Sequence, residues 1–292
     1  MKHILSAFLA LFFVSQSFAQ ITATILDSTT KEPVPYVNIW VENENIGTSA
    51  DENGLYTLPK IDTSKIIIFS AVGYAEIRIK VADLASVLYL SQKALELDEL
   101  LIQQKRNLHK HIVNPMELVN ETYFSSTCPD RNPWMIARYM PYREEYAKTP
   151  FLSEIKFLTN SEARNAIFYV RLYSIDKKGN PGDLLHDEPI MGKAISKKKS
   201  VTTVNVSKLN IRFPETGFFV AIEWLIIKRN EFTMYTARSG KKGQICYTPV
   251  FKNVYTRGNV GKWVYQKGKW EQSKGLHDNK FFTIAVELTL TD

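Results

Sequence analysis

The chain has 292 residues, a formal net charge of +7 and two cysteines. A content of 45% hydrophobic and 12% aromatic residues is that of a globular protein and excludes a disordered chain. The length exceeds that of a typical single domain, so we expect two domains.

Residues 1–19 are predicted to form a secretory signal peptide. Lys2 and His3 precede the apolar run Ile4–Val14, and Ser17-Phe18-Ala19 has small residues where a signal peptidase cuts. The run is too short for a membrane span, although an uncleaved anchor is the alternative. We therefore expect an exported protein of the periplasm or the outer-membrane or cell surface, without a nucleic-acid partner.

Residues 21–90 are predicted to be short strands separated by turns. Apolar side chains alternate or run together in Ile21–Leu26, Val37–Val41, Leu55–Leu58, Ile66–Phe69, Ile77–Val81 and Val87–Leu90. Asp51-Glu52-Asn53-Gly54 is a turn, because Asx side chains accept hydrogen bonds from the following backbone and glycine tolerates a positive φ. Gly73 marks a bulge or a close backbone approach. About seven short strands at this spacing predict a small β-sandwich.

The motifs in this half resemble a known family. Ile25-Leu26-Asp27, Gly47-Thr-Ser-Ala-Asp-Glu-Asn-Gly54, Ser70-Ala-Val-Gly-Tyr74 and Leu97-Asp-Glu-Leu-Leu-Ile102 follow in the order of the carboxypeptidase-regulatory-like domain. The resemblance covers residues 21–102 and departs from the family's usual small residue at Pro35-Tyr36. It implies a transthyretin-like sandwich over residues 20–102, a setting in a Gram-negative cell envelope, possible association with the outer membrane, and no catalytic activity in this module.

Residues 103–133 are predicted to be a linker. Pro115 suits the first position of a helix, so we expect one short helix over residues 115–125. The charge changes sign nearby: residues 20–100 hold six basic and twelve acidic residues, net −6, whereas residues 101–292 hold thirty and eighteen, net +12. This step supports a domain boundary. Solvated lysines that protect sheet edges explain the basic half, and an anionic polysaccharide or lipid surface is the alternative.

Residues 134–292 are predicted to form a jelly-roll-like β-sandwich of roughly nine strands. In Phe218–Ile227 the side chains of Phe218, Val220, Ile222, Trp224 and Ile226 share one face, and Phe282–Leu290 alternates in the same way. Trp263 to Trp270 is expected to be a hairpin around Lys267-Gly268. Phe168–Leu185 and Pro214–Leu225 resemble jelly-roll halves that follow carboxypeptidase-regulatory-like domains in envelope proteins of unassigned function, which implies no activity.

Aromatic and basic side chains gather in residues 238–280, which hold ten basic and two acidic residues. Exposed rings stack on sugars, so the candidate binding residues are Tyr255, Trp263, Tyr265 and Trp270. The interpretation that we favour is that these rings pack into the core or clamp the hairpin.

Catalytic and metal-binding patterns do not stand out in the sequence. His109 and His111 lack the spaced glutamates of a zinc peptidase, and no Gly-x-Ser-x-Gly elbow occurs, so we expect neither a catalytic residue nor a metal or other cofactor. Glu223, inside the strongest strand, is expected to pair with an arginine or to face solvent. Cys128 and Cys246 either form a disulfide or remain as two buried thiols.

The sequence thus predicts an exported, non-catalytic accessory protein of the cell envelope that binds a protein or a glycan. The alternatives are a structural spacer of an outer-membrane assembly and, with less support from the residues, a hydrolase acting on cell-wall or peptide substrates.

Overall fold

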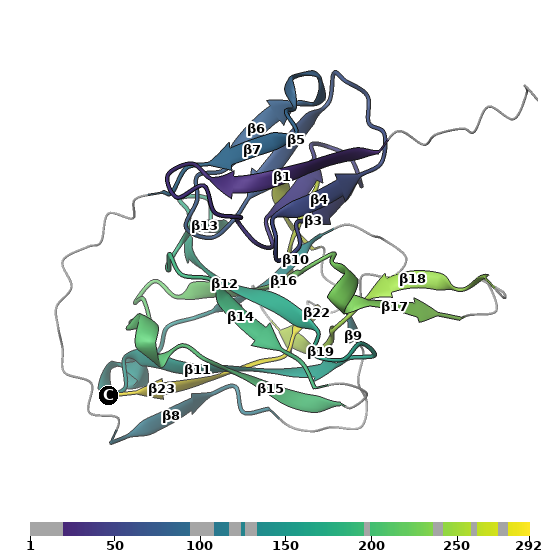
Figure 1. The fold of residues 1–292 in the computed structure, drawn as a ribbon. Helices are drawn as coiled ribbons and strands as arrows, with labels where there is room; N and C mark the ends of the chain where they lie inside the picture. Colours follow the sequence, from purple (N-terminus) through teal and green to yellow (C-terminus); the bar gives the residue numbers. More distant parts are fainter. Residues whose placement is uncertain are drawn as a thin grey trace, which may run out of the picture.

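The computed structural model describes residues 20–93, 108–116, 124–125, 133–195, 199–235, 242–257, 262–273 and 280–292. Over these residues the protein is all-β, as predicted, and consists of two β-sandwiches that lie against each other (Figure 1). Four short 3-10 helices join strands: η1 (Val81–Asp83), η2 (Glu144–Lys148), η3 (Ser207–Leu209) and η4 (Lys228–Asn230). Within the described part of the chain, no helix has the length and hydrophobicity needed to cross a bilayer.

The first sandwich packs a three-stranded sheet on a four-stranded sheet. The strand orders are β4-β1-β7 and β3-β2-β5-β6 over the described residues, with β1 (Ile21–Asp27), β2 (Asn38–Val41), β3 (Gly47–Ser49), β4 (Leu55–Leu58), β5 (Ile66–Ser70), β6 (Ile77–Lys80) and β7 (Val87–Leu90). Alternating residues such as Ile25, Ile39, Tyr56, Phe69 and Leu88 form the core between the sheets. The period-2 pattern of the sequence therefore predicted this half well.

Asp27 shows why the spaced motifs of this sandwich belong together. Its carboxylate accepts hydrogen bonds from the backbone N–H groups of Thr29 (2.7 Å) and Thr30 (2.9 Å), the Tyr74 hydroxyl (3.0 Å) and Gln92 Nε2 (2.8 Å). These donors, led by the Thr30 N–H, hold the pKa of Asp27 down at about 2. One carboxylate thus ties the end of β1 to the glycine–tyrosine motif and to the chain that leaves β7.

The turn before β4 has the chemistry predicted for it. Asp51 Oδ1 accepts hydrogen bonds from the backbone of Asn53 (2.8 Å) and Leu55 (3.0 Å), and Gly54 has a φ of +72°. Gly73 also has a positive φ, and a Cβ there would lie 2.9 Å from the Asp187 carbonyl oxygen of the second sandwich. The close approach predicted at Gly73 is therefore an approach to the other sandwich.

The second sandwich has two sheets, each of seven strands over the described residues. One has the order β13-β12-β16-β10-β20-β21, with β14 also on β12; its strands are β10 (Met135–Met140), β12 (Ile167–Ile175), β13 (Pro181–Leu184), β14 (Ile190–Lys193), β16 (Phe218–Trp224), β20 (Lys262–Gln266) and β21 (Lys269–Gln272). We call it the shared sheet, because both of its faces are covered.

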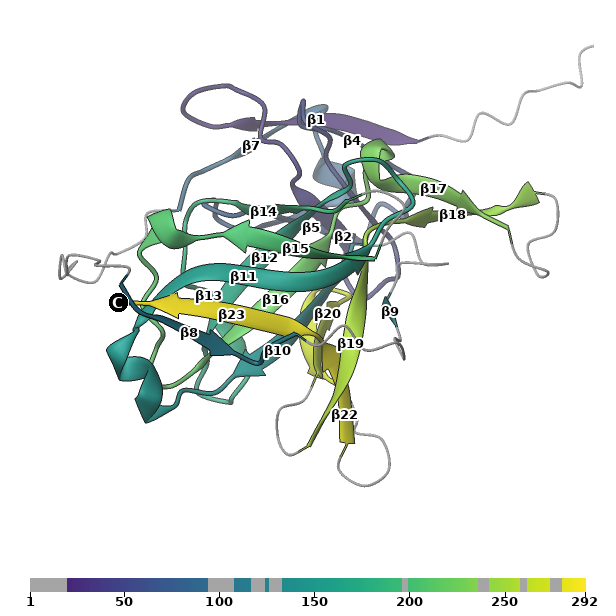
Figure 2. The same ribbon diagram turned by 90° about the horizontal axis from the view of Figure 1, so that it is seen from below.

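Figure 2 shows the other sheet, the basal sheet, on the far side of the molecule from the first sandwich. Its order is β22-β19-β11-β23-β8, with β15 on β11 and β9 on β19; its strands are β8 (Lys110–Val113), β9 (Phe124–Ser125), β11 (Phe151–Asn160), β15 (Ser200–Asn205), β19 (Val250–Arg257), β22 (Lys280–Ile284) and β23 (Val286–Thr291). A separate hairpin of β17 (Glu231–Met234) and β18 (Gln244–Tyr247) projects from the body (Figure 1).

Two segments that we assigned to the linker are strands of the basal sheet. Lys110–Val113 pairs with β23, and Phe124–Ser125 pairs with β19. The predicted helix over residues 115–125 falls largely on residues 117–123, which lie outside the described residues, while its last two residues form β9. Backbone pairing to distant strands decides these elements, and local sequence does not report it.

The core between the shared and basal sheets contains most of the predicted faces. Phe218, Val220, Ile222 and Trp224 all belong to it, as do Ile284, Val286, Leu288 and Leu290. Ile226, which we expected on the same face, lies beyond the end of β16 and outside this core. The predicted strand Phe282–Leu290, however, is broken at Ala285, where the backbone N–H bonds to the Lys252 carbonyl oxygen (2.8 Å). On one side of the break β22 pairs with β19, and on the other β23 pairs with β11.

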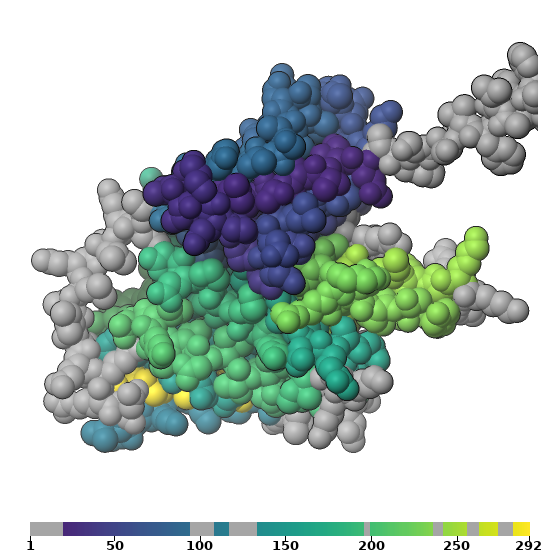
Figure 3. All heavy atoms as spheres, viewed as in Figure 1, coloured from purple at the N-terminus to yellow at the C-terminus, as the bar shows by residue number. Residues whose placement is uncertain are grey.

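The first sandwich covers the outer face of the shared sheet, and Figure 3 shows the two in direct contact. Trp40 on β2 is buried; its Nε1 donates to the Pro133 carbonyl oxygen (2.8 Å) and its ring meets that of Tyr265 edge-on at 5.3 Å. Ser49 Oγ accepts a hydrogen bond from the Ile226 N–H (3.0 Å). A buried tryptophan whose N–H is satisfied makes a specific contact as well as a large apolar one.

We predict that Trp40→Ala weakens the junction between the sandwiches. The change removes a buried indole and leaves the Pro133 carbonyl without its partner, so the free energy of unfolding should fall by about 3–5 kcal/mol. Urea unfolding monitored by fluorescence measures this loss.

The matched control is Leu55→Ala, which trims a side chain that is 44% exposed on the same sandwich. It should change the unfolding free energy by about 0.5 kcal/mol or less. Equal effects of the two substitutions would contradict a structural role for the Trp40 contact.

Candidate functional site

The predicted hairpin is present as β20 and β21. Trp263–Gln266 pairs with Lys269–Gln272, and the turn residues Lys267 and Gly268 have φ values of 54° and 83°. Two successive positive φ values are those of the tight turn that suits the strand twist. A Cβ at Gly268 would lie 2.6 Å from Ile68 Cδ1, so this turn also contacts the first sandwich.

The aromatic side chains of this hairpin are turned toward other rings. Trp263 meets Phe219 at 5.9 Å, and Trp270 meets Tyr173 at 5.5 Å and Tyr265 at 5.2 Å, all edge-on. Trp263, Tyr265 and Trp270 are each partly buried in one cluster on the outer face of the shared sheet. Packing against Phe219 and Tyr173 therefore covers part of these rings.

Tyr255, the fourth candidate, belongs to another part of the sandwich. It lies on β19 of the basal sheet and is 54% exposed. The structure therefore brings Trp263, Tyr265 and Trp270 together and places Tyr255 apart from them.

Glu223 is buried on the same outer face and pairs with Arg171 of the neighbouring strand. The two side chains are 0% and 2% exposed, and Arg171 Nε donates to Glu223 Oε2. Burial alone lowers the pKa of Arg171, but the Glu223 carboxylate more than compensates and leaves it above the ordinary value. The expected arginine partner is thus present, in the middle of the sheet, away from its edge.

The cysteines and histidines take separate places. Cys246 on β18 is disulfide-bonded, and Cys128, the other cysteine of the sequence, lies outside the described residues. His109 Nδ1 lies 2.8 Å from Asp292 Oδ2, whereas His111 Nε2 lies 3.8 Å from Glu145 Oε1. No group of three potential metal ligands occurs among the residues that the structure describes.

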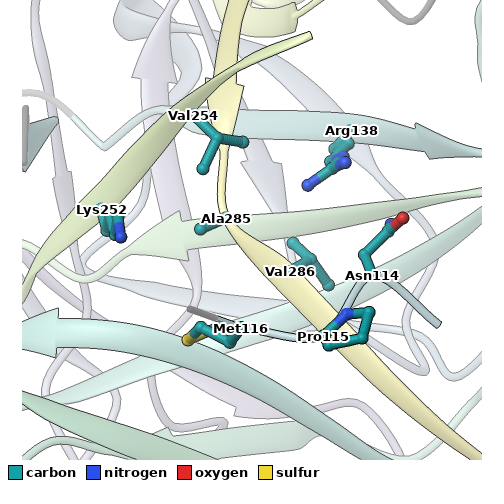
Figure 4. Close-up of a pocket in the computed structure, with 8 residues that line it drawn as sticks. All are labelled: Asn114, Pro115, Met116, Arg138, Lys252, Val254, Ala285 and Val286. Atoms are coloured by element: carbon teal, nitrogen blue, oxygen red, sulfur yellow. The ribbon is translucent and has the colours of Figure 1, made fainter. Parts of the chain in front are cut away.

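A cavity of about 220 Å³ lies where the two sheets of the second sandwich meet at the Ala285 break (Figure 4). Asn114, Pro115 and Met116 follow β8, Lys252 and Val254 come from β19, Ala285 and Val286 form the break, and Arg138 comes from β10. In Figure 4, Arg138 and Lys252 lie on either side of Ala285. We call this the Arg138 cavity.

Arg138 reaches the cavity because it occupies a core-facing position of β10. Its neighbours in the alternation, Ile136 and Met140, both belong to the core between the sheets. Its Nη1 donates to the Ile284 carbonyl oxygen of the basal sheet (3.2 Å), while its buried Nε has no hydrogen-bond partner. Burial lowers the pKa of Arg138 to about 10.

The described residues around the cavity give Arg138 no acidic partner. Five of them have apolar side chains, Asn114 is neutral, and Lys252, 4% exposed, carries a second positive charge. The acid beside the cavity is Glu287, which accepts a hydrogen bond from the Met116 N–H (2.6 Å) and pairs with Lys156 (2.9 Å). The site can therefore accept a small anion that also carries apolar surface.

Sequence reasoning missed this cavity, although one signal was present. In Met135–Met140 an arginine interrupts the apolar face made by Ile136 and Met140. A charge at a core-facing strand position is rare unless it has a partner.

We predict that Glu223→Leu destabilises the protein by about 3–5 kcal/mol, because it leaves the buried Arg171 charge without a partner. The double variant Arg171→Met with Glu223→Leu should regain most of that loss, since apolar residues of similar volume replace a buried pair at little cost. Urea unfolding of the two single variants and the double variant measures the coupling. Additive losses would contradict a direct pair.

We predict that the combined Trp263→Ala and Trp270→Ala variant loses at least about 3 kcal/mol of stability, because both rings pack on the shared sheet. Glycan-array binding by the folded variant, recorded beside Tyr255→Ala, should be unchanged. Loss of a glycan signal in the folded double variant would restore these rings as a sugar-binding surface.

The comparisons with solved structures find distant likenesses. One is the clostridial cysteine protease Cwp84 after propeptide cleavage, with 10% identity and a TM-score of 0.38 over 84% of this chain and 50% of that chain. Another holds the cysteine protease and lectin-like domains of Cwp84, a surface-layer associated protein of Clostridium difficile, with 9% identity and a TM-score of 0.37 over 84% and 45%. The chain thus spans about half the length of these structures. No curated protein matches it.

The comparison with protein families identifies the first sandwich. The model of the CarboxypepD_reg-like domain matches residues 21–102, the range over which the spaced motifs were found. Over residues 21–102 the chain is therefore similar to a carboxypeptidase-regulatory-like domain, which is a regulatory type of domain.

Proposed function

We propose that this protein is an exported, non-catalytic accessory protein of a Gram-negative cell envelope that binds a protein or glycan partner through its second, jelly-roll-like sandwich. The observation that carries the proposal is the Arg138 cavity. A partly buried arginine that has no acidic partner among the described residues costs stability, and an anion from outside would offset that cost. The regulatory-type first sandwich supports an accessory role and serves as a fixed base.

The first sandwich and the Arg138 side chain lie on different faces of the shared sheet. Trp40 and Ser49 fix the first sandwich to the outer face of the shared sheet, whereas the Arg138 cavity is lined by Arg138 from the opposite face of that sheet and by residues of the basal sheet. The partner can therefore reach the cavity without displacing the first sandwich.

A structural spacer of an outer-membrane assembly is the second candidate function. The observation that favours it is the same junction, because a buried tryptophan and an interdomain hydrogen bond couple the two sandwiches as a spacer requires. A spacer has no need of a ligand, so binding separates the two candidates.

The test is binding of the purified protein, residues 20–292, to a glycan array and to a peptide array. We expect reproducible binding to at least one anionic class, and this binding should weaken as salt rises because charge contributes to it. Absence of specific binding on both arrays would overturn the binding function and favour the spacer.

A further inference from the structure

The Arg138 cavity has the chemistry of a site for one particular kind of anion. A guanidinium has five N–H donors in a planar fork that matches a carboxylate. The described structure gives Arg138 one acceptor, the Ile284 carbonyl, so donors remain for a ligand. The charged part of the ligand should therefore lie at Arg138.

The apolar lining of the cavity indicates which chemical group of the ligand accompanies its charged group. Pro115, Met116, Val254, Ala285 and Val286 present apolar surface around the two cations. Met is a flexible, polarisable side chain that adapts to ligands of different shape. A volume of about 220 Å³ is below that of a typical drug-sized site and is suited to a single residue. The ligand should therefore combine one anionic group with one small apolar group.

These requirements distinguish between the kinds of anionic ligand that could bind in the cavity. A uronic acid surrounds its carboxylate with hydroxyl groups, which need polar partners, and sugars favour aromatic platforms. Among the described lining residues Asn114 is the one neutral polar side chain, and none is aromatic. Inorganic phosphate has no apolar part for these walls. A peptide end, by contrast, places a carboxylate and one side chain on the same carbon atom.

We propose that the Arg138 cavity binds the free C-terminal carboxylate of a peptide or protein whose last residue is apolar. Arg138 receives the carboxylate, and the last side chain lies against Met116, Val254 and Val286. This inference rests on the proposed binding function and names the partner class for the same site.

The experiment is a fluorescence-polarisation titration of residues 20–292 with a labelled Gly-Ser-Gly-Ser-Leu peptide that has a free carboxylate. The same peptide with a C-terminal amide, and a labelled oligogalacturonate, are measured in parallel. We expect the free acid to bind and the amide to bind at least tenfold more weakly, because the amide lacks the charge that Arg138 pairs with.

Three variants locate the binding. Arg138→Met should weaken the free-acid peptide at least tenfold, and Val254→Phe should do the same by filling the cavity without a change of charge. Arg143→Met is the matched control, because Arg143 is 65% exposed and pairs with Glu145 on the surface; it should leave binding unchanged. Arg138→Met should also keep or raise the melting temperature of the unliganded protein, since it replaces a partly buried charge, without an acidic partner among the described residues, by an apolar chain.

The outcomes separate the two proposals. Equal binding of acid and amide, or full binding by Arg138→Met, would overturn the carboxylate site. Binding of the oligogalacturonate but not of the peptide, lost in Arg138→Met, would overturn the peptide class and leave the binding function standing. Failure of both probes while the arrays show a ligand would overturn this inference alone. A melting temperature lowered in Arg138→Met, with peptide binding intact, would make Arg138 a structural residue.

Discussion

The shared sheet is the element on which the rest of the structure depends, because both of its faces are buried. One face packs on the basal sheet through Phe218, Val220, Ile222 and Trp224. The other face carries Phe219, Ala221 and Glu223 under the cover of the aromatic cluster and the first sandwich. A sheet buried on both sides cannot present its faces to a ligand. The Arg138 cavity lies away from these two covered faces, at the break between β22 and β23.

The strand faces that could be predicted were those in which apolar side chains alternate regularly along the sequence. Alternation correctly assigned the inward side chains from Phe218 to Trp224, and Asp51–Gly54 correctly gave a turn, because both follow from local chemistry. Trp40 and Ser49 were not assigned to an interface, since their partners Pro133 and Ile226 are far away in the sequence. Alternation says that a side chain leaves one face of a strand and does not say what covers it.

The candidate site was even harder to predict from the sequence than the interface between the sandwiches, because it depends on contacts between segments that are distant in the chain. The break at Ala285 arises because β22 and β23 pair with different strands, and the cavity exists because of that break. The sequence there reads as one uninterrupted alternating strand. Arg138 could be noticed as a charge on an apolar face, but which described residues surround it appears only when β8, β19 and β22 are placed around it.

Two arginines of the shared sheet show how the same residue type can have opposite consequences. Arg171 is paired with Glu223, which raises its pKa despite burial. Among the described residues Arg138 has no such partner, and burial lowers its pKa to about 10. Pairing inside the fold offsets the desolvation of Arg171, whereas the partly buried Arg138 lacks that compensation from the described residues. Apolar walls around Arg138 restrict which anions could fill the cavity without leaving their own polar groups unsatisfied.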